Sequence, residues 1–196
     1  MLPNQPSVRV SSKGARHLRA GIPWVYRIDV AEAEELPSGT VVSVEDPRGN
    51  FVGQAFWATH SPIALRLLTR ARETVDAGFF RSRIAQAYER RRALFPQDDA
   101  FRVVYGEADL LPGLFVDRYA DGITVQIISE GMEARGDEIL GLLDEVIAPR
   151  LIAVRNDTAA RDFECLERSS MLAKGEAPAT LRYHEGPNLF EIDLMD

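Results

Sequence analysis

A cluster of cations near the start of the sequence has residue types and spacing suited to binding an anion. Residues 13–21 hold three permanent cations and a histidine, and a proline and a tryptophan follow directly. A planar guanidinium donates two N–H groups to a phosphate, and a glycine lets a phosphate approach the backbone closely. The pattern therefore predicts contact with a nucleic-acid backbone. The candidate residues are Lys13, Arg16, His17, Arg19, Gly21, Pro23 and Trp24.

The same cluster also has a purely structural interpretation. If this segment is helical, Arg16 and Arg19 lie three residues apart on one face, and such a charged face is often only solvated. Trp24 could stack on an unpaired base. Beside Val25 and Tyr26, however, burial in a core is the more common position for a tryptophan. Both interpretations are kept at this point.

A second basic segment spans residues 76–95. Its apolar residues recur at three- and four-residue spacing, which predicts an amphipathic helix that begins after Asp76 and ends before Pro96. Arg90 and Arg91 are its candidate RNA contacts. The alternative is that this helix pairs with acidic residues of the second half of the chain. Further arginines of this basic patch are Arg70, Arg72, Arg81, Arg83 and Arg92.

Composition and charge exclude several classes of protein. The 196 residues are 45% hydrophobic and 27% charged, and no stretch reaches the ~18 apolar residues of a membrane span. The single cysteine cannot form an internal disulfide, which favours the reducing cytoplasm. Residues 1–100 carry 14 Lys and Arg against 11 Asp and Glu, whereas residues 101–196 carry 9 against 19. The net negative charge argues weakly against a polyanion partner, and the split permits one only on the first half.

Groups that could perform catalysis are sparse. None of the three histidines has a partner at metal-ligand spacing, and the sequence contains no G-x-S-x-G and no G-x-G segment. Cys165 has no base beside it, which favours an inert, partly buried thiol. Glu107, Asp109 and Asp117 surround a Leu-Pro-Gly-Leu turn. Asp117 is expected to pair with a nearby arginine, and a structural role is favoured for the three carboxylates over metal binding or acid–base chemistry. No catalytic residue and no metal site is predicted.

The elements that must position these residues fall into two modules. Residues 40–44 and 51–57 flank an Asp-Pro-Arg-Gly-Asn turn and predict a hairpin, and residues 63–68 predict a third strand. Short strands at this spacing favour a small β-barrel over residues 1–72. The basic helix then lies in a connecting segment, residues 73–97.

The second module, residues 98–196, is predicted to be an α+β sandwich in the order strand, strand, helix, strand, strand. An Asp-Gly pair between two alternating runs signals a hairpin. Apolar residues on one face of residues 133–147 predict a helix that packs on the sheet. The predicted strands are residues 101–107, 115–119, 123–128, 151–154, 181–183 and 189–192.

Three motifs resemble those of one protein family. They are Gly21-x-Pro23-Trp24-Val25, then Gly106-Glu107-Ala108-Asp109-x-Leu111-Pro112-Gly113-Leu114-x-Val116-Asp117-Arg118-Tyr119, and then Arg155-Asn156-Asp157-x-x-x-Arg161. From about residue 7 to Asp196 the chain is similar to the front half of the PUA-containing, S-adenosylmethionine-dependent methyltransferases of the cytosine-5 type. That family modifies 23S rRNA of the large ribosomal subunit.

The resemblance implies a PUA-like barrel, then the α+β domain, and then a Rossmann methyltransferase domain that would begin just after residues 190–194. The S-adenosylmethionine site and the catalytic cysteines of the family lie in that third domain. No cofactor and no transferase activity are therefore expected of this chain alone. The implied partners are ribosomal RNA and the missing catalytic domain in cis, with no membrane. A homodimer through an exposed strand edge is left open.

Three positions depart from the pattern of the family. Ile22 replaces a usual histidine, so a contact made by that histidine is not carried over. Leu110 replaces a usual glycine, which is expected to alter the turn before Pro112. Cys165 replaces the glycine of a Glu-Gly-Leu segment, and it is therefore not taken for the catalytic cysteine of the family.

The expected function is RNA recognition on behalf of an rRNA methyltransferase. The barrel would bind RNA, and the second module would hold it at a fixed position relative to the catalytic domain. One alternative is a stand-alone RNA-binding or protein-interaction module, in which the acidic half binds a partner. Another is a small enzyme that uses Asp109 and Asp117, which is the weaker hypothesis because nothing in the sequence binds a cofactor.

Overall fold

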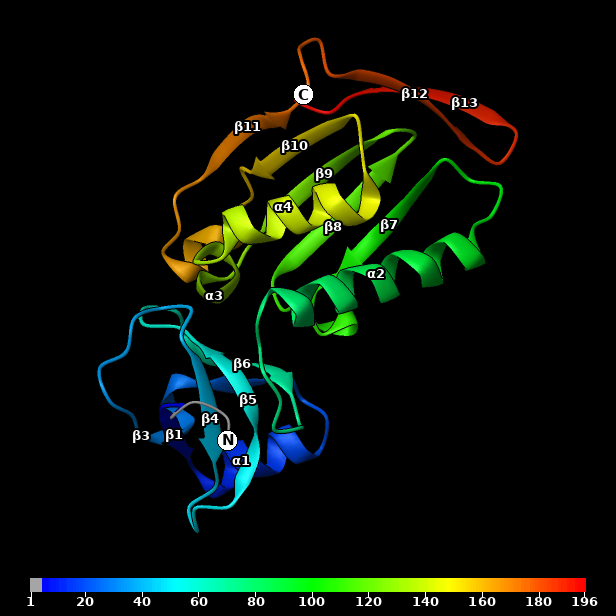
Figure 1. The fold of residues 1–196 in the computed structure, drawn as a ribbon. Coiled ribbons are helices and arrows are strands. Elements are labelled where there is room, and N and C mark those ends of the chain that lie inside the picture. The colour runs from blue at the N-terminus through cyan, green and yellow to red at the C-terminus, as the bar shows by residue number, and fades with distance from the viewer. Residues whose placement is uncertain (1–4) are drawn as a thin grey trace.

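A computed structural model of the protein describes residues 5–196 as two packed modules (Figure 1). The first is a curled sheet that forms a half-barrel, with the strand order β2-β6-β5-β4-β1-β3. The start of the predicted barrel, residues 1–4, lies outside the described residues. The strands are β1 Ser7–Val10, β2 Trp24–Tyr26, β3 Val30–Glu32, β4 Val41–Glu45, β5 Phe51–Trp57 and β6 Ile63–Thr69.

The predicted hairpin and third strand of the half-barrel are confirmed. β4 pairs antiparallel with β5, and β5 pairs antiparallel with β6. Asp46 shapes the turn between β4 and β5, because its carboxylate accepts the backbone N–H groups of Arg48 at 2.9 Å and Asn50 at 3.0 Å. One helix, α1 Ser12–Arg19, follows β1 and packs on the sheet.

The second module is a five-stranded sheet in the order β11-β10-β9-β8-β7. Two helices, α2 Ala77–Leu94 and α4 Gly136–Ile147, cover one face, and the β12–β13 hairpin lies against the other (Figure 1). No helix among residues 5–196 is long and apolar enough to cross a membrane. The strands are β7 Ala100–Tyr105, β8 Leu114–Tyr119, β9 Gly122–Ile127, β10 Leu151–Asn156, β11 Ser169–Lys174, β12 Thr180–Glu185 and β13 Asn188–Asp193.

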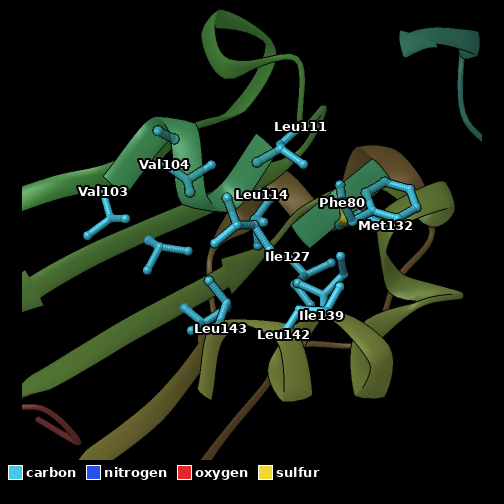
Figure 2. Close-up of a cluster of buried hydrophobic side chains, with 14 of the residues drawn as sticks. Phe80, Val103, Val104, Leu111, Leu114, Ile127, Met132, Ile139, Leu142 and Leu143 are labelled. Carbon is cyan, nitrogen blue, oxygen red and sulfur yellow. The ribbon is translucent and has the colours of Figure 1, made fainter. Parts of the chain in front are cut away.

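The basic helix predicted from the spacing of its apolar residues is confirmed as α2. Its N-terminus is capped by the Asp76 side chain, which accepts the backbone N–H of Phe79 at 3.1 Å. Although this helix was expected to connect the modules, its buried residues pack into the core of the second sheet. Figure 2 shows Phe80 of α2 in that core, beside Met132 and Ile139.

Two expectations for the second module need correction. The helix predicted over 133–147 is α4, which begins only at Gly136, and a short helix that was not predicted, α3 Glu130–Glu133, precedes it. Ala134, between them, packs so closely on the barrel that a side chain at Gly39 would lie 2.4 Å from it. Strand β11 was not predicted, because its sequence, Ser-Ser-Met-Leu-Ala-Lys, has little β-branched or aromatic character.

Candidate nucleic-acid interface

The burial of one face of α1 fixes the direction of its cations. Gly14, Ala15 and Leu18 are buried against the half-barrel, and a side chain at position 14 would lie 3.3 Å from Val25. The Ser11 side chain caps the helix by accepting the Gly14 N–H at 3.1 Å. Since these residues face the core, the candidate cations of α1 all lie on the exposed face. These are Lys13, Arg16 and Arg19.

The cations of α1 differ in how strongly they are held. The Lys13 ammonium lies 3.5 Å from Asp29, and Arg19 donates to Asp46 at 2.7 Å. The hydrogen bond from Arg19 is the main reason that the pKa of Asp46 lies far below its ordinary value. Arg16, by contrast, has no carboxylate partner among residues 5–196. Arg16 therefore presents the guanidinium that is freest to meet a phosphate.

The loop that follows α1 lies directly beside this cationic face. Gly21 adopts a φ of +101°, which favours glycine, and a side chain there would meet open space. The Ile22 N–H returns to the His17 carbonyl at 3.1 Å, and the Pro23 carbonyl accepts the Leu67 N–H at 2.7 Å. The loop is therefore held at both ends. Trp24, which begins β2, is partly buried.

Three further arginines extend this face beyond α1. Arg70 donates to the Leu18 carbonyl of α1 at 3.0 Å, and the guanidinium of Arg72 lies 4.1 Å above the Phe51 ring. Arg48 is exposed in the turn that Asp46 shapes. The sequence pattern places Arg70 and Arg72 with the basic helix and gives no signal for Arg48. We call the set the α1 surface: Lys13, Arg16, Arg19, Arg48, Arg70 and Arg72.

The candidates Arg90 and Arg91 lie on the second module and pair with Asp109. Arg91 donates to both carboxylate oxygens, at 2.6 and 2.8 Å, and Arg90 binds the same group. The Asp109 side chain is only 1% exposed, and the Arg91 side chain is 15% exposed. These ion pairs agree with the alternative interpretation, in which the basic helix pairs with acidic residues of the second half of the chain. RNA contact by Arg90 and Arg91 stays a prediction.

The other candidate groups for chemistry also have structural partners. Asp117 pairs with Arg102 at 2.8 Å, and Glu107 pairs with Arg66 at 2.8 Å. No group of three or more possible metal ligands occurs in the described part of the chain. Cys165 is exposed, which corrects the expectation of a partly buried thiol.

Two residues of the Arg155–Arg161 motif, Asn156 and Arg161, form hydrogen bonds to backbone groups near the ends of β9 and β10. The Asn156 side chain accepts the backbone N–H of Ile127 at 2.7 Å. Arg161 is only 2% exposed and donates to the Glu167 carbonyl at 2.7 Å. Leu110 and Cys165, which replace usual glycines of the family, have φ values of 57° and 55°. The backbone is therefore left-handed at both positions although neither residue is glycine.

Buried carboxylates join the two modules. Glu130 of α3 accepts backbone N–H groups from Ser61 at 2.6 Å and His60 at 2.9 Å. Burial opposes its ionisation, but hydrogen bonds from Ser38, from Ser61 and from the adjacent backbone outweigh that cost, and the pKa of Glu130 lies below its ordinary value. Glu164 accepts the Ser61 hydroxyl at 2.7 Å. The half-barrel is therefore held in one orientation.

Arg66 adds charge pairs to the same junction. It leaves β6 of the half-barrel and donates to Glu164 at 2.7 Å and to Glu107 at 2.8 Å. Its side chain is only 11% exposed. No motif or spacing in the sequence marks Glu130, Glu164 or Arg66 as functional residues. Only the folded chain reveals them, because Ser61 and Glu164 are separated by 103 positions.

Comparison with known proteins finds a family match for the first module and relatives that span both modules. Residues 8–70 match the family of PUA-like domains. The chain is 34% identical to ribosomal RNA large subunit methyltransferase I of Tolumonas auensis over 160 residues, which are 80% of this chain and 40% of that protein. It is 31% identical to the enzyme of the same name from Alteromonas mediterranea over 183 residues, which are 91% of this chain and 46% of that protein.

Solved structures share the fold of the whole chain. A protein from Streptococcus mutans described as a SAM-dependent methyltransferase aligns with a TM-score of 0.78 and 18% identity, over 98% of this chain and 49% of that one. A methyltransferase complexed with SAH aligns with a TM-score of 0.79 over the same shares. The chain thus spans less than half the length of these proteins, and over the shared part it is homologous to ribosomal RNA large subunit methyltransferase I.

Proposed function

We propose that this chain is the RNA-recognition portion of an S-adenosylmethionine-dependent rRNA methyltransferase of the cytosine-5 type. The observation that carries the proposal is the α1 surface, six exposed or partly exposed cations on the module that matches PUA-like domains. Homology to rRNA methyltransferases points to the same substrate. Such an enzyme would act in the cytoplasm.

Recognition on this surface would begin with the RNA backbone. Arg16 has no carboxylate partner among the described residues, so a phosphate would displace no existing ion pair. The loop from Gly21 to Trp24 would let a phosphate or sugar approach the backbone. Phosphate contacts would supply affinity, whereas RNA shape or unpaired bases would supply specificity.

The second module would act as a rigid support. Residues 77–196, which include α2, carry 22 Asp and Glu against 14 Lys and Arg, and this net negative charge disfavours RNA over much of the surface of the module. Glu130 and Glu164 hold the half-barrel against it through hydrogen bonds to Ser61. RNA bound at α1 would thus lie in a fixed position relative to any domain attached to the second module.

Methyl transfer itself is assigned to residues outside this chain. A Rossmann-type cofactor site needs closely spaced glycines after a strand, and the glycines of this chain stand singly. The residues present do not fit S-adenosylmethionine by that criterion, so no catalytic step is derived through it. We propose that the chain alone binds RNA without transferring a methyl group. Methyl transfer would then need a catalytic domain in cis as its partner. A homodimer through an open sheet edge is a further prediction, tested by the mass in solution.

The test of the proposed function is RNA binding by the chain and by a double charge-reversal variant. If single-stranded RNA is bound through phosphate contacts, log affinity should fall linearly with log salt, by about 0.7 per contact. Arg16→Glu with Arg19→Glu should weaken binding strongly and reduce that slope by about 1.4. Fluorescence anisotropy with a labelled rRNA fragment measures both quantities.

A matched control changes the same charge on the second module. Arg150→Glu with Arg168→Glu alters two exposed arginines that lie far from α1 in the sequence, and it should reduce RNA affinity much less. Equal affinity of the α1 double variant and the unchanged chain would contradict the proposal. Absence of RNA binding, together with salt-insensitive binding of a protein, would favour the interaction-module alternative.

A further inference from the structure

A cleft of about 670 Å³ opens where the half-barrel meets the second module. The barrel contributes the loop 38–40 that precedes β4, and the second module contributes α4 and the ends of β9 and β10. These two strands are parallel neighbours. The cleft therefore lies beyond the carboxyl ends of the one parallel pair in an otherwise antiparallel sheet.

Apolar side chains form one wall of this cleft. Ile127 of β9, Val154 of β10 and Leu140 of α4 line it, together with Met171 of β11. Met171 is 52% exposed, although it lies opposite Val154 in the sheet. Ile127 and Val154 are only 2% and 5% exposed, so a flat, apolar molecule would contact mainly Met171 and the partly buried Leu140. A methionine adapts its shape to such a ligand and contacts ring edges favourably.

A buried amide supplies a hydrogen-bond donor to the same cleft. Asn156 lines it and is only 5% exposed. Its Oδ1 accepts the Ile127 N–H at 2.7 Å, whereas its Nδ2 donates no hydrogen bond to any of residues 5–196. Nδ2 is not among the fully buried side-chain atoms that lack a partner, so it reaches the solvent of the cleft and can donate to a ligand there.

The charged groups of the cleft select against a phosphate. Asp137 and Glu138, in the first turn of α4, border it. Glu138 pairs with Arg135 at 2.8 Å, while Asp137 makes no ion pair within the described chain. A carboxylate repels a phosphate but accepts N–H groups from the edge of a nucleobase. The site thus offers an apolar wall, one amide donor and one free carboxylate acceptor.

We propose that this cleft binds a single unpaired nucleobase that carries an amino group, from an RNA whose backbone is held by the α1 surface. The proposal rests on the proposed function, since it needs an RNA bound to the chain. The apolar wall would contact the face of the base, the Asn156 Nδ2 would donate to a ring nitrogen or carbonyl, and Asp137 would accept from the amino group. Guanine, adenine and cytosine meet these requirements, and uracil lacks the amino group.

Methionine methyl groups give a direct readout of this cleft. The chain has four methionines. Met171 lies in the cleft, and Met132 is fully buried in the core of the second module, which makes it an internal reference. With ¹³C-methyl methionine, addition of an unpaired RNA oligonucleotide should shift the Met171 signal and leave the Met132 signal in place. An oligonucleotide of uridines should shift Met171 less than one rich in guanine.

Two substitutions test the site through affinity. Met171→Ala removes part of the apolar wall, and Asp137→Asn removes the acceptor charge, and each should lower the affinity for a guanine-rich oligonucleotide severalfold. The matched control is Glu176→Gln, an exposed acidic residue outside the cleft, which should leave affinity unchanged. Circular dichroism of each variant checks that the fold is retained.

The outcomes separate this proposal from the proposed function. If RNA binds and Arg16→Glu with Arg19→Glu weakens it, but the Met171 signal does not move, the nucleobase site is overturned and the proposed function stands. An equal response to uridine and guanine oligonucleotides overturns the role given to Asp137. If no RNA binds at any salt concentration, both proposals are overturned.

Discussion

The backbone N–H of Ser61 donates to the Glu130 carboxylate at 2.6 Å across 69 positions of sequence, and this bond joins the half-barrel to the second module. The same carboxylate accepts the N–H groups of Thr59 at 3.1 Å and His60 at 2.9 Å. Three successive N–H groups of one loop therefore converge on a single buried anion. A charge held in this way fixes orientation, because any rotation of the modules would leave it unpaired.

The first prediction concerns stability in acid. The pKa of Glu130 lies below its ordinary value in the folded chain, so its ionised form contributes stability above the unfolded value of about 4.3. That contribution should be lost as the pH falls through the folded pKa. Glu130→Gln should lower the free energy of unfolding by about 1–3 kcal/mol at neutral pH.

Urea unfolding of both proteins as a function of pH measures this difference. The difference in unfolding free energy between the two proteins should be constant above the pKa of Glu130 in the unfolded chain. It should shrink as the pH falls through the lower pKa of Glu130 in the folded chain. The exposed carboxylate of Glu145 serves as a control, since its side chain is 56% exposed and pairs only with Arg81 at the surface. Glu145→Gln should change stability by no more than about 0.5 kcal/mol. A pH-independent difference for Glu130→Gln would show that its charge is not what stabilises the junction.

The second prediction separates two neighbouring arginines of α2. The Arg91 side chain is 15% exposed and the Arg90 side chain is 56% exposed, yet both bind the buried Asp109. Arg91→Ala removes a bidentate partner of a buried charge and should cost about 3 kcal/mol of unfolding free energy. Arg90→Ala should cost about 1 kcal/mol or less.

Thermal unfolding and RNA anisotropy of both variants test this assignment. If Arg90 contacts RNA, Arg90→Ala should weaken binding while stability stays nearly constant. Equal destabilisation by the two substitutions would contradict the difference in burial. Loss of RNA affinity only in the Arg91 variant, with its stability retained, would assign the contact to Arg91 instead.

The third prediction concerns left-handed backbone at residues other than glycine. Cys165 has a φ of 55° and an exposed side chain, so it bears the strain of that conformation with little packing in return. Cys165→Gly should stabilise the chain by about 1 kcal/mol. Leu110, with a φ of 57° and 41% exposure, should gain less from the same change, because its side chain is partly packed.

A glycine at positive φ provides the opposite case. Gly113 has a φ of +79°, and a side chain there would lie 2.3 Å from the Ser129 Oγ. Gly113→Ala should therefore destabilise the chain by well over 1 kcal/mol. Chemical denaturation of the three variants checks the ranking. A loss of stability in Cys165→Gly would mean that the thiol makes a contact whose value exceeds the strain.

Local patterns in the sequence predict those elements whose signals are themselves local. The spacing of apolar residues around Phe80 and Ile84 predicts α2, and the capping Asp76 predicts where it begins. The Asp-Gly pair at Gly122 predicts the β8–β9 hairpin. The expected pairing of Asp117 with an arginine is confirmed in Arg102.

Contacts between distant segments could not be predicted in this way. Nothing near Glu130 in the sequence signals that it is buried. Its hydrogen-bond donors, such as the backbone N–H of Ser61, belong to the other module. The same holds for Arg70, which joins α1 only through the curl of the half-barrel. Strand β11 is formed by pairing with β10 rather than by its own propensity. The RNA contacts of the candidate residues are still untested predictions.

The last prediction uses the ion pair that restrains part of the α1 surface. Arg19 donates to Asp46 at 2.7 Å, and Asp46 also accepts the backbone N–H groups of Arg48 and Asn50. Asp46→Asn keeps an oxygen for the turn but removes the negative charge beside Arg19. Arg19 should then meet a phosphate without first leaving a carboxylate, and RNA affinity should rise about threefold at low salt.

The gain should shrink as salt is added, because an electrostatic contribution at an exposed site is screened. Anisotropy at two salt concentrations measures it, and circular dichroism checks that the turn between β4 and β5 is kept. The comparison variant is Asp29→Asn, since Asp29 lies 3.5 Å from Lys13 and also accepts the Ser11 hydroxyl at 2.8 Å. If both variants bind RNA more tightly, phosphate contact lies along the length of α1. If Asp46→Asn leaves affinity unchanged at low salt, Arg19 is a structural partner of the turn, and the contact would rest on Arg16 and Lys13.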